Sequence, residues 1–321
     1  GKREGYYFWD MDGRKFCDIH LNGGTFNLGH RNPEIIQALI DATQDFDIGN
    51  HHFAATGRAL LGKRMAELSP EGLQYSVFSP SGGEAVDVAI KSARYATKRK
   101  KIVSLKGCYH GHTGLSVSTG DARFKEPFLA EGESGCFEQV PLNDIEAMEN
   151  VLKKEDVAAV LMESILATYG FAIPEAGYLA EVKKICEKYG TLYIADEVQT
   201  GLMRTGKMWS IDHEGFIPDM IISAKGFGGG IYPMACTLMN EKAGKWLQEI
   251  GRMHGSTTGG SELGCMVSLK MLDITTRKST IETIHKNTKL MTDFANKMID
   301  ESNGFLKSYT QRGIIMGMKF D

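Results

Sequence analysis

A lysine stands directly before a cluster of glycines in the stretch "SAKGFGGGIYP", residues 223–233. Lysines beside glycines often belong to phosphate-binding nucleotide loops, but in those loops the lysine follows the glycines and opens a helix. Here Lys225 comes first, behind the apolar run "DMIIS", and the glycines lead into another apolar run. This order favours a covalent use of the amine, because a lysine at the end of a strand can form a Schiff base with an aldehyde cofactor.

A second candidate lies in "FSPSGGEAVDVAIKSAR", residues 78–94, where an apolar strand ends, a turn follows and a helix begins. Glycines let backbone N–H groups approach an anion closely, and the N-terminus of a helix adds its dipole. Ser81, Gly82 and Gly83 are therefore candidates for binding a phosphate. The turn matches neither the Walker A loop nor the dinucleotide-binding glycine motif. Taken alone, it is equally compatible with a glycine-rich turn that binds no ligand.

Two adjacent acidic residues are the third candidate feature of a site. In "YIADEVQTG" (193–201) an apolar strand carries Asp196 and Glu197 at its carboxyl end, where open α/β sheets bind their ligands. A carboxylate there can bind a metal, accept a proton, pair with a cationic ring nitrogen, or cap the next segment. The letters "DEVQ" supply no further ligands at a metal-binding spacing.

These three features together match the needs of pyridoxal phosphate. That cofactor needs an anion site for its phosphate, a carboxylate that keeps its ring nitrogen protonated, and a lysine that holds its aldehyde. The ring withdraws electrons only while its nitrogen is protonated, so Asp196 would tune it. The combination predicts a pyridoxal-phosphate site at one edge of a sheet. A nucleotide-binding protein that uses "GFGGG" is the alternative, and the position of Lys225 before the glycines argues against it.

Short apolar runs alternate with helical patterns along most of the chain. The runs are "YSVFS" (75–79), "KKIVSL" (100–105), "VAAVLME" (157–163), "TLYIAD" (191–196), "DMIIS" (219–223) and "MACTLM" (234–239). Such continuous apolar runs are typical of strands buried on both faces. Residues 175–189 and 144–153 have apolar side chains at helical spacing. Gly190 would end the first helix, and either Asn143 or Asp144 would cap the second. The alternation predicts an open, mostly parallel α/β sheet.

The two ends of the chain differ from this pattern. "YYFWDMDGRKFCDI" predicts a hairpin around its Asp-Gly pair, residues 262–303 are largely helical, and "GIIMGMKF" resembles a strand. We therefore expect part of a small domain in residues 1–41, a large cofactor-binding domain in 42–250, and a linker with the rest of the small domain in 251–321. Because the chain starts without Met and stops soon after an apolar run, we expect that last portion to be incomplete.

Composition limits the classes of partner. The 321 residues carry a net charge of −3, and the basic cluster "KRKK" at 98–101 is short, so nucleic acid is not an expected partner. No apolar run approaches the roughly 20 residues that span a membrane, so a membrane is not expected either. The six cysteines are scattered without a CxxC pair, which favours a reducing, cytoplasmic location over a disulfide framework or zinc ribbon.

Histidines provide the main rival hypothesis, a metal site. They occur as His51-His52, as His110 and His112, and as His254. A His-x-His pair on a loop is weak evidence for a metal without a third ligand at a suitable spacing. We therefore expect no metal.

Five motifs, in this order and spacing, resemble those of class-III pyridoxal-phosphate aminotransferases of fold type I. They are "SGGEAVDVAIKSAR", "YHGHT", "DEVQTGLMRTG", "SAKGFGGG" and "HGSTTGG", and the resemblance extends over nearly the whole chain. It implies a large α/β domain, whose mostly parallel seven-stranded sheet is flanked by helices, and a smaller α+β domain built from both chain ends. It also implies a homodimer with a shared active site.

The resemblance also implies roles for the matching residues. Lys225 would hold the cofactor as a Schiff base and act as the catalytic acid and base, and Asp196 would pair with the ring nitrogen. Gln199 would contact the ring hydroxyl, while Val198 and Tyr109 would pack on opposite faces of the ring.

The same resemblance implies contacts to the phosphate. These would come from Ser81, Gly82 and Gly83, although members of the family commonly have Thr or Ala where Gly83 stands. Thr257 of "HGSTTGG" would reach the phosphate of the neighbouring subunit, and His110 belongs to the same cofactor-binding set.

One stretch departs from the family pattern. After the strand at 157–163 members usually have E-P-x-Q-G-E-G-G, whereas this chain has "ESILATYGFAIP". Glu163 remains and is a possible site residue. Ser164 replaces Pro, Leu166 replaces Gln and Thr168 replaces the second Glu.

That second Glu is associated, in ornithine-type members, with switching an arginine between two substrates, so its loss puts 2-oxoglutarate as the amino acceptor in doubt. We expect an aminotransferase that acts on small molecules, an amino acid or amine and a keto acid or aldehyde. An aminomutase, an epimerase, or an ammonia- or phospho-lyase of the same family is the alternative.

Overall fold

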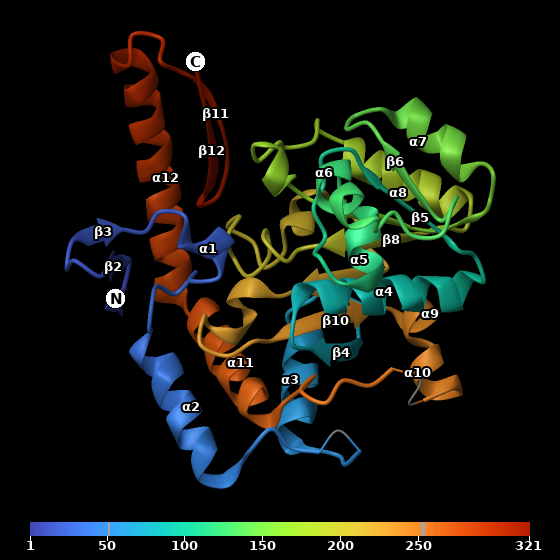
Figure 1. The fold of residues 1–321 in the computed structure, drawn as a ribbon, viewed down its shortest axis with the longest axis horizontal. Helices are drawn as coiled ribbons and strands as arrows, with labels where there is room; N and C mark the ends of the chain where they lie inside the picture. The colour runs from blue at the N-terminus through green and yellow to red at the C-terminus, as the bar shows by residue number, and fades with distance from the viewer. Residues whose placement is uncertain (51, 252–253) are drawn as a thin grey trace.

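The computed structural model describes residues 1–50, 52–251 and 254–321 (Figure 1). Within these ranges the centre of the fold is a seven-stranded sheet with the strand order β4-β10-β9-β8-β7-β5-β6. The strands are β4 (Tyr75–Ser79), β5 (Lys101–Leu105), β6 (Phe137–Val140), β7 (Val157–Glu163), β8 (Leu192–Asp196), β9 (Met220–Ser223) and β10 (Ala235–Met239). Strand β10 runs antiparallel to its neighbours β4 and β9, and the other neighbours pair in parallel. The predicted mostly parallel sheet is thus confirmed.

The central strands lie between two apolar cores, which explains their continuous apolar sequence. Every residue of β7 and β8 is buried, as expected for parallel strands that helices cover on both faces. Their register sets Glu163 directly beside Asp196 at the carboxyl ends of the two strands. The sheet therefore delivers two carboxylates to the edge where such folds bind ligands.

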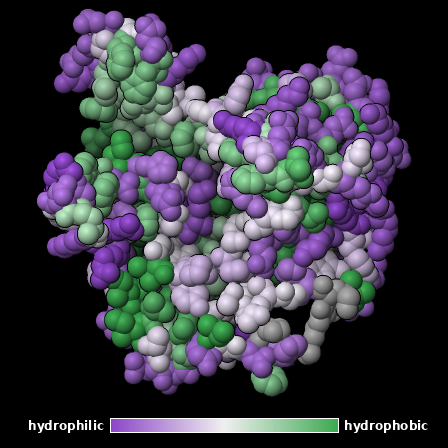
Figure 2. All heavy atoms as spheres, in the orientation of Figure 1, coloured by the Kyte–Doolittle hydropathy of each residue, from purple (hydrophilic) through white to green (hydrophobic). Residues whose placement is uncertain are grey.

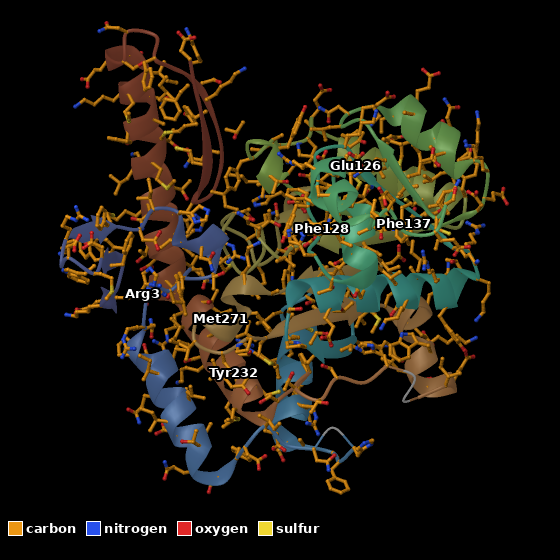
Figure 3. The ribbon with its side chains drawn as sticks, in the orientation of Figure 1. Arg3, Glu126, Phe128, Phe137, Tyr232 and Met271 are labelled. Atoms are coloured by element: carbon orange, nitrogen blue, oxygen red, sulfur yellow. The ribbon has the colours of Figure 1, made fainter. Side chains whose placement is uncertain are left out.

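Helices flank both faces of the sheet. The longer ones are α2 (Pro33–Asp45), α3 (Thr56–Glu67), α4 (Gly82–Thr97), α7 (Ile145–Leu152), α8 (Tyr178–Lys188), α11 (Glu262–Thr275) and α12 (Lys278–Glu301). Helix α4 packs into one core through residues such as Ala85 and Ala89, and α3, α7, α8 and α11 contribute to the other. Met271 of α11 is fully buried in that second core, and Tyr232 packs at its border (Figure 3).

Shorter helical segments connect these elements. They are α1 (Leu21–Gly24), α5 (Gly114–Thr119), α6 (Ala122–Lys125), α9 (Glu241–Gly244), α10 (Trp246–Glu249) and the 3₁₀ turns η1 (Glu126–Phe128), η2 (Ala167–Tyr169), η3 (Ser210–His213) and η4 (Lys225–Gly228).

The two helices predicted from apolar spacing are present. The side chain of Asp144 caps α7 by accepting a hydrogen bond from the backbone N–H of Ala147 at 2.8 Å. Asn143 instead accepts a hydrogen bond from the backbone N–H of Glu175 at 3.0 Å, so the cap is Asp144. Gly190 follows α8 with a φ of +68°, the left-handed conformation that commonly ends a helix.

Both chain ends form small elements beside the main sheet. The strands β1 (Arg3–Glu4), β2 (Tyr7–Trp9) and β3 (Lys15–Cys17) form an antiparallel sheet, and β2 with β3 is the predicted hairpin. Helix α12 is followed by an antiparallel hairpin of β11 (Leu306–Arg312) and β12 (Ile315–Phe320), which lies alongside it in Figure 1. The sequence indicated β12 but not its partner. The domain boundaries stay a prediction, and all strands of the main sheet fall between residues 42 and 250.

The outer surface is mixed in polarity. Figure 2 shows a mostly hydrophilic face on which hydrophobic side chains gather over α2. One exposed apolar residue of that helix is Ile40. No described helix is both long and apolar enough to cross a bilayer, and the six cysteines are free thiols.

Candidate active site

A cavity of about 180 Å³ lies at the carboxyl ends of β7, β8 and β9. Its walls are formed by Gly82, Gly83, Tyr109, His110, Gly111, Glu163, Asp196, Val198, Gln199, Ala224 and Lys225. The structure therefore brings together all the predicted site residues except Ser81 and Thr257. Gly111 and Ala224 complete the wall, and sequence reasoning did not single them out.

Among the described residues that line the cavity, Lys225 is the only lysine. It follows β9 directly after Ala224, and its Nζ donates a hydrogen bond to Oε1 of Gln199 at 3.2 Å. Burial lowers the pKa of the Lys225 amine, and the negative charge of Asp196 opposes part of that shift. A lowered pKa makes the amine neutral more often, as a nucleophile and proton acceptor requires.

Asp196 is tied to the loop after β5 through His110. Its Oδ2 lies 2.7 Å from Nδ1 of His110, and its Oδ1 accepts a hydrogen bond from the backbone N–H of Val198 at 3.1 Å. Burial alone would lower the pKa of the His110 imidazole, but the neighbouring Cys108 sulfur and the bonded Asp196 carboxylate raise that pKa well above its usual value. His110 therefore orients the carboxylate of Asp196.

Glu163 anchors the loop that carries Tyr109. Its Oε1 accepts a hydrogen bond from the backbone N–H of Tyr109 at 2.9 Å, and its Oε2 accepts one from the backbone N–H of Ala167 at 3.1 Å. Burial raises the pKa of Glu163 to about 7; the charge of His110 opposes the shift and that of Asp196 adds to it. Glu163 thus exchanges its proton near neutral pH.

This raised pKa predicts a pH-dependent stability that Glu163→Gln removes. The folded protein keeps the proton up to about pH 7, whereas the unfolded chain releases it near 4.5. The stability that the protonated group contributes is complete below pH 4.5 and is lost as the pH rises through 7. Urea unfolding of the cofactor-free protein should show E163Q gaining about 2 to 3 kcal/mol over wild type between pH 5 and pH 8. A difference that stays constant over this range would contradict the assignment.

The predicted phosphate turn stands at the N-terminus of α4. Ser81 lies outside the cavity wall and caps the helix, since its Oγ accepts a hydrogen bond from the backbone N–H of Glu84 at 3.2 Å. At Gly82 an added Cβ would lie 3.3 Å from Cβ of Ala224, so the backbone itself forms the wall. The first N–H groups of a helix have no intrahelical acceptor and are therefore available to an anion.

Gly83 has a local reason to be glycine. A Cβ there would lie 2.8 Å from Oγ1 of Thr113 and 3.2 Å from its Cγ2. The backbone of Gly111 is also close, because a Cβ on Gly111 would lie 2.8 Å from Cα of Gly83. Thr113 thus fills the space that the Thr or Ala common in the family would need.

Gly83→Ala should lower the free energy of unfolding by about 1 to 3 kcal/mol, the usual cost of overpacking. Thr113→Ala should relieve the clash, so the double variant should be more stable than the sum of the two single effects predicts. Gly62→Ala in α3 is a matched control, because no heavy atom lies within 4 Å of its added Cβ, and it should be neutral or stabilising. Strictly additive effects of the first two changes, measured by urea unfolding, would contradict the contact.

The other carboxylate of "DEVQ", Glu197, has a structural role. It is fully buried and accepts hydrogen bonds from the hydroxyls of Ser164 and Thr200 and from two backbone N–H groups at 210–211. Successive side chains of an extended segment point to opposite sides, so Asp196 faces the cavity and Glu197 faces the following loop. Ser164, which stands where the family has Pro, belongs to this structural set.

Thr257 lies apart from the cavity. It is exposed in the loop before α11 and is not among the residues that line the site of its own chain.

The described histidines have separate partners. Among the described residues, no group of three His, Cys, Asp or Glu side chains is placed to hold a metal ion. His110 bonds to Asp196, and Nδ1 of His254 lies 2.7 Å from Nζ of Lys91. His51 lies outside the described residues.

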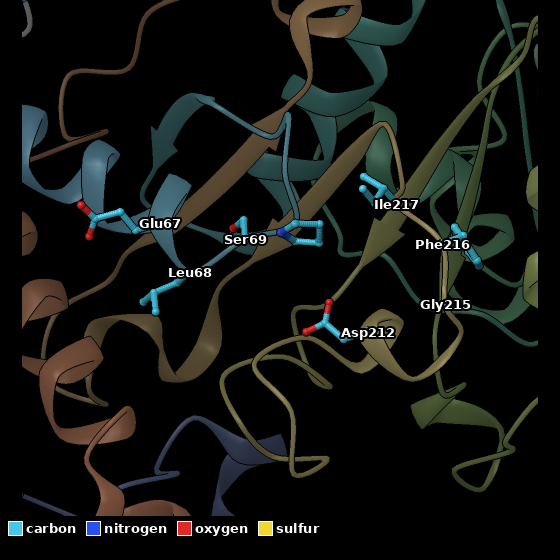
Figure 4. Close-up of a pocket in the computed structure, with 8 residues that line it drawn as sticks. Glu67, Leu68, Ser69, Asp212, Gly215, Phe216 and Ile217 are labelled. Carbon is cyan, nitrogen blue, oxygen red and sulfur yellow. The ribbon is translucent and has the colours of Figure 1, made fainter.

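A larger cavity, of about 480 Å³, lies between the end of α3 and the loop 212–217 (Figure 4). It is lined by Glu67, Leu68, Ser69, Pro70, Asp212, Gly215, Phe216 and Ile217. Its charged side chains are two carboxylates, and it contains no basic group among the described residues. Such a lining suits neither a phosphate nor an aldehyde that needs an amine.

One neighbour of Lys225 comes from the N-terminal segment and was not predicted. At Gly23 of α1 an added Cβ would lie 3.1 Å from Cε of Lys225 and 3.6 Å from Nε2 of Gln199. The φ of Gly23 is +63°, which suits glycine. The Asn-Gly pair marks a turn, but nothing in the sequence ties that turn to a lysine so far along the chain.

The groups of the 180 Å³ cavity fit pyridoxal phosphate. It offers backbone N–H groups at a helix N-terminus for a phosphate, a carboxylate for a protonated ring nitrogen, and a buried amine for an aldehyde. Tyr109 and Val198 line it with flat and branched apolar surface. The fold and this set of groups define a pyridoxal-phosphate enzyme of fold type I.

The family follows from comparison with known proteins. The aminotransferase class-III family model matches residues 1–321, and an uncharacterized aminotransferase of Archaeoglobus fulgidus is 46% identical over 320 residues, which cover 99% of this chain and 74% of the relative. The chain belongs to the class-III aminotransferases, which use pyridoxal phosphate.

Solved structures agree with this assignment. The ornithine aminotransferase of Toxoplasma gondii superimposes with a TM-score of 0.92 at 25% identity, over all of this chain and 77% of that one. The taurine:2-oxoglutarate aminotransferase of Bifidobacterium kashiwanohense, solved with pyridoxal phosphate and glutamate, has a TM-score of 0.93 at 26% identity and the same coverage. The predicted family, fold and cofactor are confirmed.

Proposed function

We propose that this protein transfers an amino group between an amino acid or amine and a keto acid or aldehyde, with Lys225 holding the cofactor and moving the proton. The observation that carries the proposal is the convergence of Lys225, Asp196 and the Gly82-Gly83 turn on one cavity. Membership of the class-III aminotransferases supports the same reaction class.

Lys225 performs two tasks in this proposal. When bound, pyridoxal phosphate draws electrons away from the carbon that carries the substrate's amino group. The Nζ of Lys225 would hold the cofactor until a substrate amine takes its place, and it would then accept a proton from that carbon and donate it again as an acid. Gln199, which accepts a hydrogen bond from Nζ at 3.2 Å, orients the amine and would contact the ring hydroxyl.

The remaining residues hold the ring and the phosphate. Asp196 keeps a proton on the ring nitrogen, and His110 keeps Asp196 in place through their 2.7 Å contact. Val198 and Tyr109, which line the cavity, would pack on the two ring faces. The turn that Ser81 caps would bind the phosphate through backbone N–H groups.

The proposal includes a homodimer, in which Thr257 reaches the phosphate of the neighbouring subunit. Exposure of Thr257 outside its own cavity supports this role. Mixed dimers test it. If each site uses its own Lys225 and its neighbour's Thr257, a K225A subunit paired with a T257A subunit contains one intact site and regains activity. A mixture that stays as inactive as its parents would contradict the shared site. The cytoplasmic location stays a prediction.

Visible absorbance and chemical fixation test the cofactor assignment directly. The purified protein should be yellow, and borohydride should attach the cofactor to the peptide that contains Lys225, as read by mass spectrometry. Protein that stays colourless after addition of pyridoxal phosphate would contradict the proposal.

A second candidate function is that of an aminomutase, an epimerase, or an ammonia- or phospho-lyase. The loop after β7 favours it, because Leu166 is buried and Oγ1 of Thr168 donates a hydrogen bond to O of Gly107 at 3.0 Å. Neither side chain offers a charge to a second substrate. Incubation with candidate amines and no keto acid separates the two functions. Ammonia or phosphate released over many turnovers indicates a lyase, and one half-reaction per site indicates an aminotransferase.

A further inference from the structure

Arg204 is buried and donates hydrogen bonds to three backbone carbonyl oxygens. Its Nε bonds to O of Gln199 at 2.6 Å, its Nη1 to O of Gly24 at 2.8 Å, and its Nη2 to O of Val198 at 3.0 Å. A buried arginine commonly pairs with a carboxylate, whereas this guanidinium joins backbone segments. Burial lowers the pKa of Arg204 to about 10, so the group is still charged at neutral pH.

Two of these carbonyls belong to the turn that faces the cavity. Val198 and Gln199 both line the site, and the backbone N–H of Val198 is held by Oδ1 of Asp196 at 3.1 Å. The side chain of Gln199 accepts a hydrogen bond from Nζ of Lys225. Arg204 therefore fixes the backbone from which Gln199 reaches the amine.

The third carbonyl belongs to a strained N-terminal segment. Leu21, Asn22, Gly23 and Gly24 all have positive φ, at 53°, 50°, 63° and 87°. Such a run is unfavourable for Leu and Asn and persists only where the surrounding structure holds it. At Gly24 an added Cβ would lie 3.2 Å from Cδ of Arg204, so the segment packs directly on the arginine. Gly23 then meets the stem of Lys225.

The C-terminal hairpin reaches the same residue. The backbone O of Arg204 accepts a hydrogen bond from the backbone N–H of Ile314 at 2.9 Å, at the turn between β11 and β12. Parts of the chain that lie far apart in sequence thus meet at Arg204.

We propose that Arg204 is a positioning residue for the reaction. By joining the turn at Val198 and Gln199 to the segment Leu21–Gly24, it holds Gly23 against the stem of Lys225 and so sets the position of the amine. This inference rests on the proposed function of Lys225. The task suits arginine because its planar fork offers several N–H groups in fixed directions, whereas lysine presents a point charge on a flexible stem.

Arg204→Lys tests the proposal, with Arg99→Lys as a matched control. Nη1 of Arg99 also bonds to two backbone carbonyls, those of Val157 at 3.2 Å and Tyr189 at 2.8 Å, but at the far end of β7 from the site. The cofactor-loaded enzymes are compared by kcat and KM, by the pH midpoint of the visible absorbance, and by hydrogen–deuterium exchange.

In R204K, amide exchange should accelerate in residues 21–26 and 198–201. The pH midpoint of the visible absorbance should differ from that of the wild type. The value of kcat should fall by about 10- to 100-fold, as expected for a misplaced catalytic group, and KM should change less. R99K should lower thermal stability alone. Wild-type exchange at 21–26 in R204K, or equal kinetic losses in R99K, would overturn the proposal.

If R204K fails to fold, Gly24→Ala tests the contact between Gly24 and Arg204 instead. Its added Cβ would lie 3.2 Å from Cδ of Arg204, so G24A alone should accelerate amide exchange in residues 21–26 and lower kcat. Wild-type exchange in residues 21–26 of G24A would overturn the positioning role of Arg204. A wild-type protein with neither the visible absorbance of the cofactor nor transamination activity would instead contradict the proposed function. Exchange at 21–26 would then still decide whether Arg204 holds the segment.

Discussion

Lys225→Ala should reduce transamination by about 10⁴-fold, the upper end of what a positioned acid–base group supplies. The reason is that Nζ of Lys225 is the amine of the cavity, and its lowered pKa keeps a share of it neutral and able to take a proton. The variant should still bind pyridoxal phosphate, because the phosphate turn and Asp196 are intact. Borohydride should no longer fix the cofactor to the protein. Single-turnover kinetics, read by absorbance, measure the effect.

Two comparisons separate chemistry from damage to the fold. Small added amines should restore part of the activity of K225A in order of their basicity, because they replace the missing proton acceptor. Lys183→Met removes another buried lysine, whose Nζ bonds to Oδ2 of Asp219 at 2.9 Å. It should lower stability while the activity per folded molecule is kept. K225A with more than about a tenth of wild-type activity would contradict a general acid–base role.

The sequence was most informative where burial is complete. The predicted runs at 157–163 and 191–196 contain β7 and β8, in which every residue is buried, because strands covered on both faces must be apolar throughout. It was least informative at edges and polar hairpins. The edge strand β6, "FEQV", is only partly buried, and β11, "LKSYTQR", is mostly exposed or half-buried. Neither has an apolar run, so neither was predicted.

The site was predictable for a topological reason. Parallel strands end at one edge of a sheet, so Lys225 after β9 and Asp196 on β8 had to lie near each other. What escaped prediction depends on side-chain packing between distant segments. The bond between His110 and Asp196, the clash that keeps position 83 a glycine, and the Gly24 contact of Arg204 each join residues that share no local pattern.

Asp196→Asn should lower kcat by about 10²- to 10³-fold, the usual loss when one preorganised electrostatic partner is removed. Asparagine keeps the shape and can still accept the hydrogen bond from the backbone N–H of Val198, but it carries no charge to hold a proton on the ring nitrogen. The pKa of His110 should fall as well, since the carboxylate helps to raise it. Imidazole NMR titration measures that pKa, and steady-state kinetics measure kcat.

Glu197→Gln tests whether the loss of kcat in D196N comes from the missing charge or from a disturbed turn. Glu197 is the adjacent residue and is equally buried, but its oxygens bind the hydroxyls of Ser164 and Thr200 on the side away from the cavity. E197Q should therefore unfold at lower urea concentration and keep its absorbance and its kcat per folded molecule. If both variants lost kcat alike, the turn after β8 would matter only as a scaffold. A loss confined to D196N, with the fall in the pKa of His110, would locate the effect in the charge of Asp196.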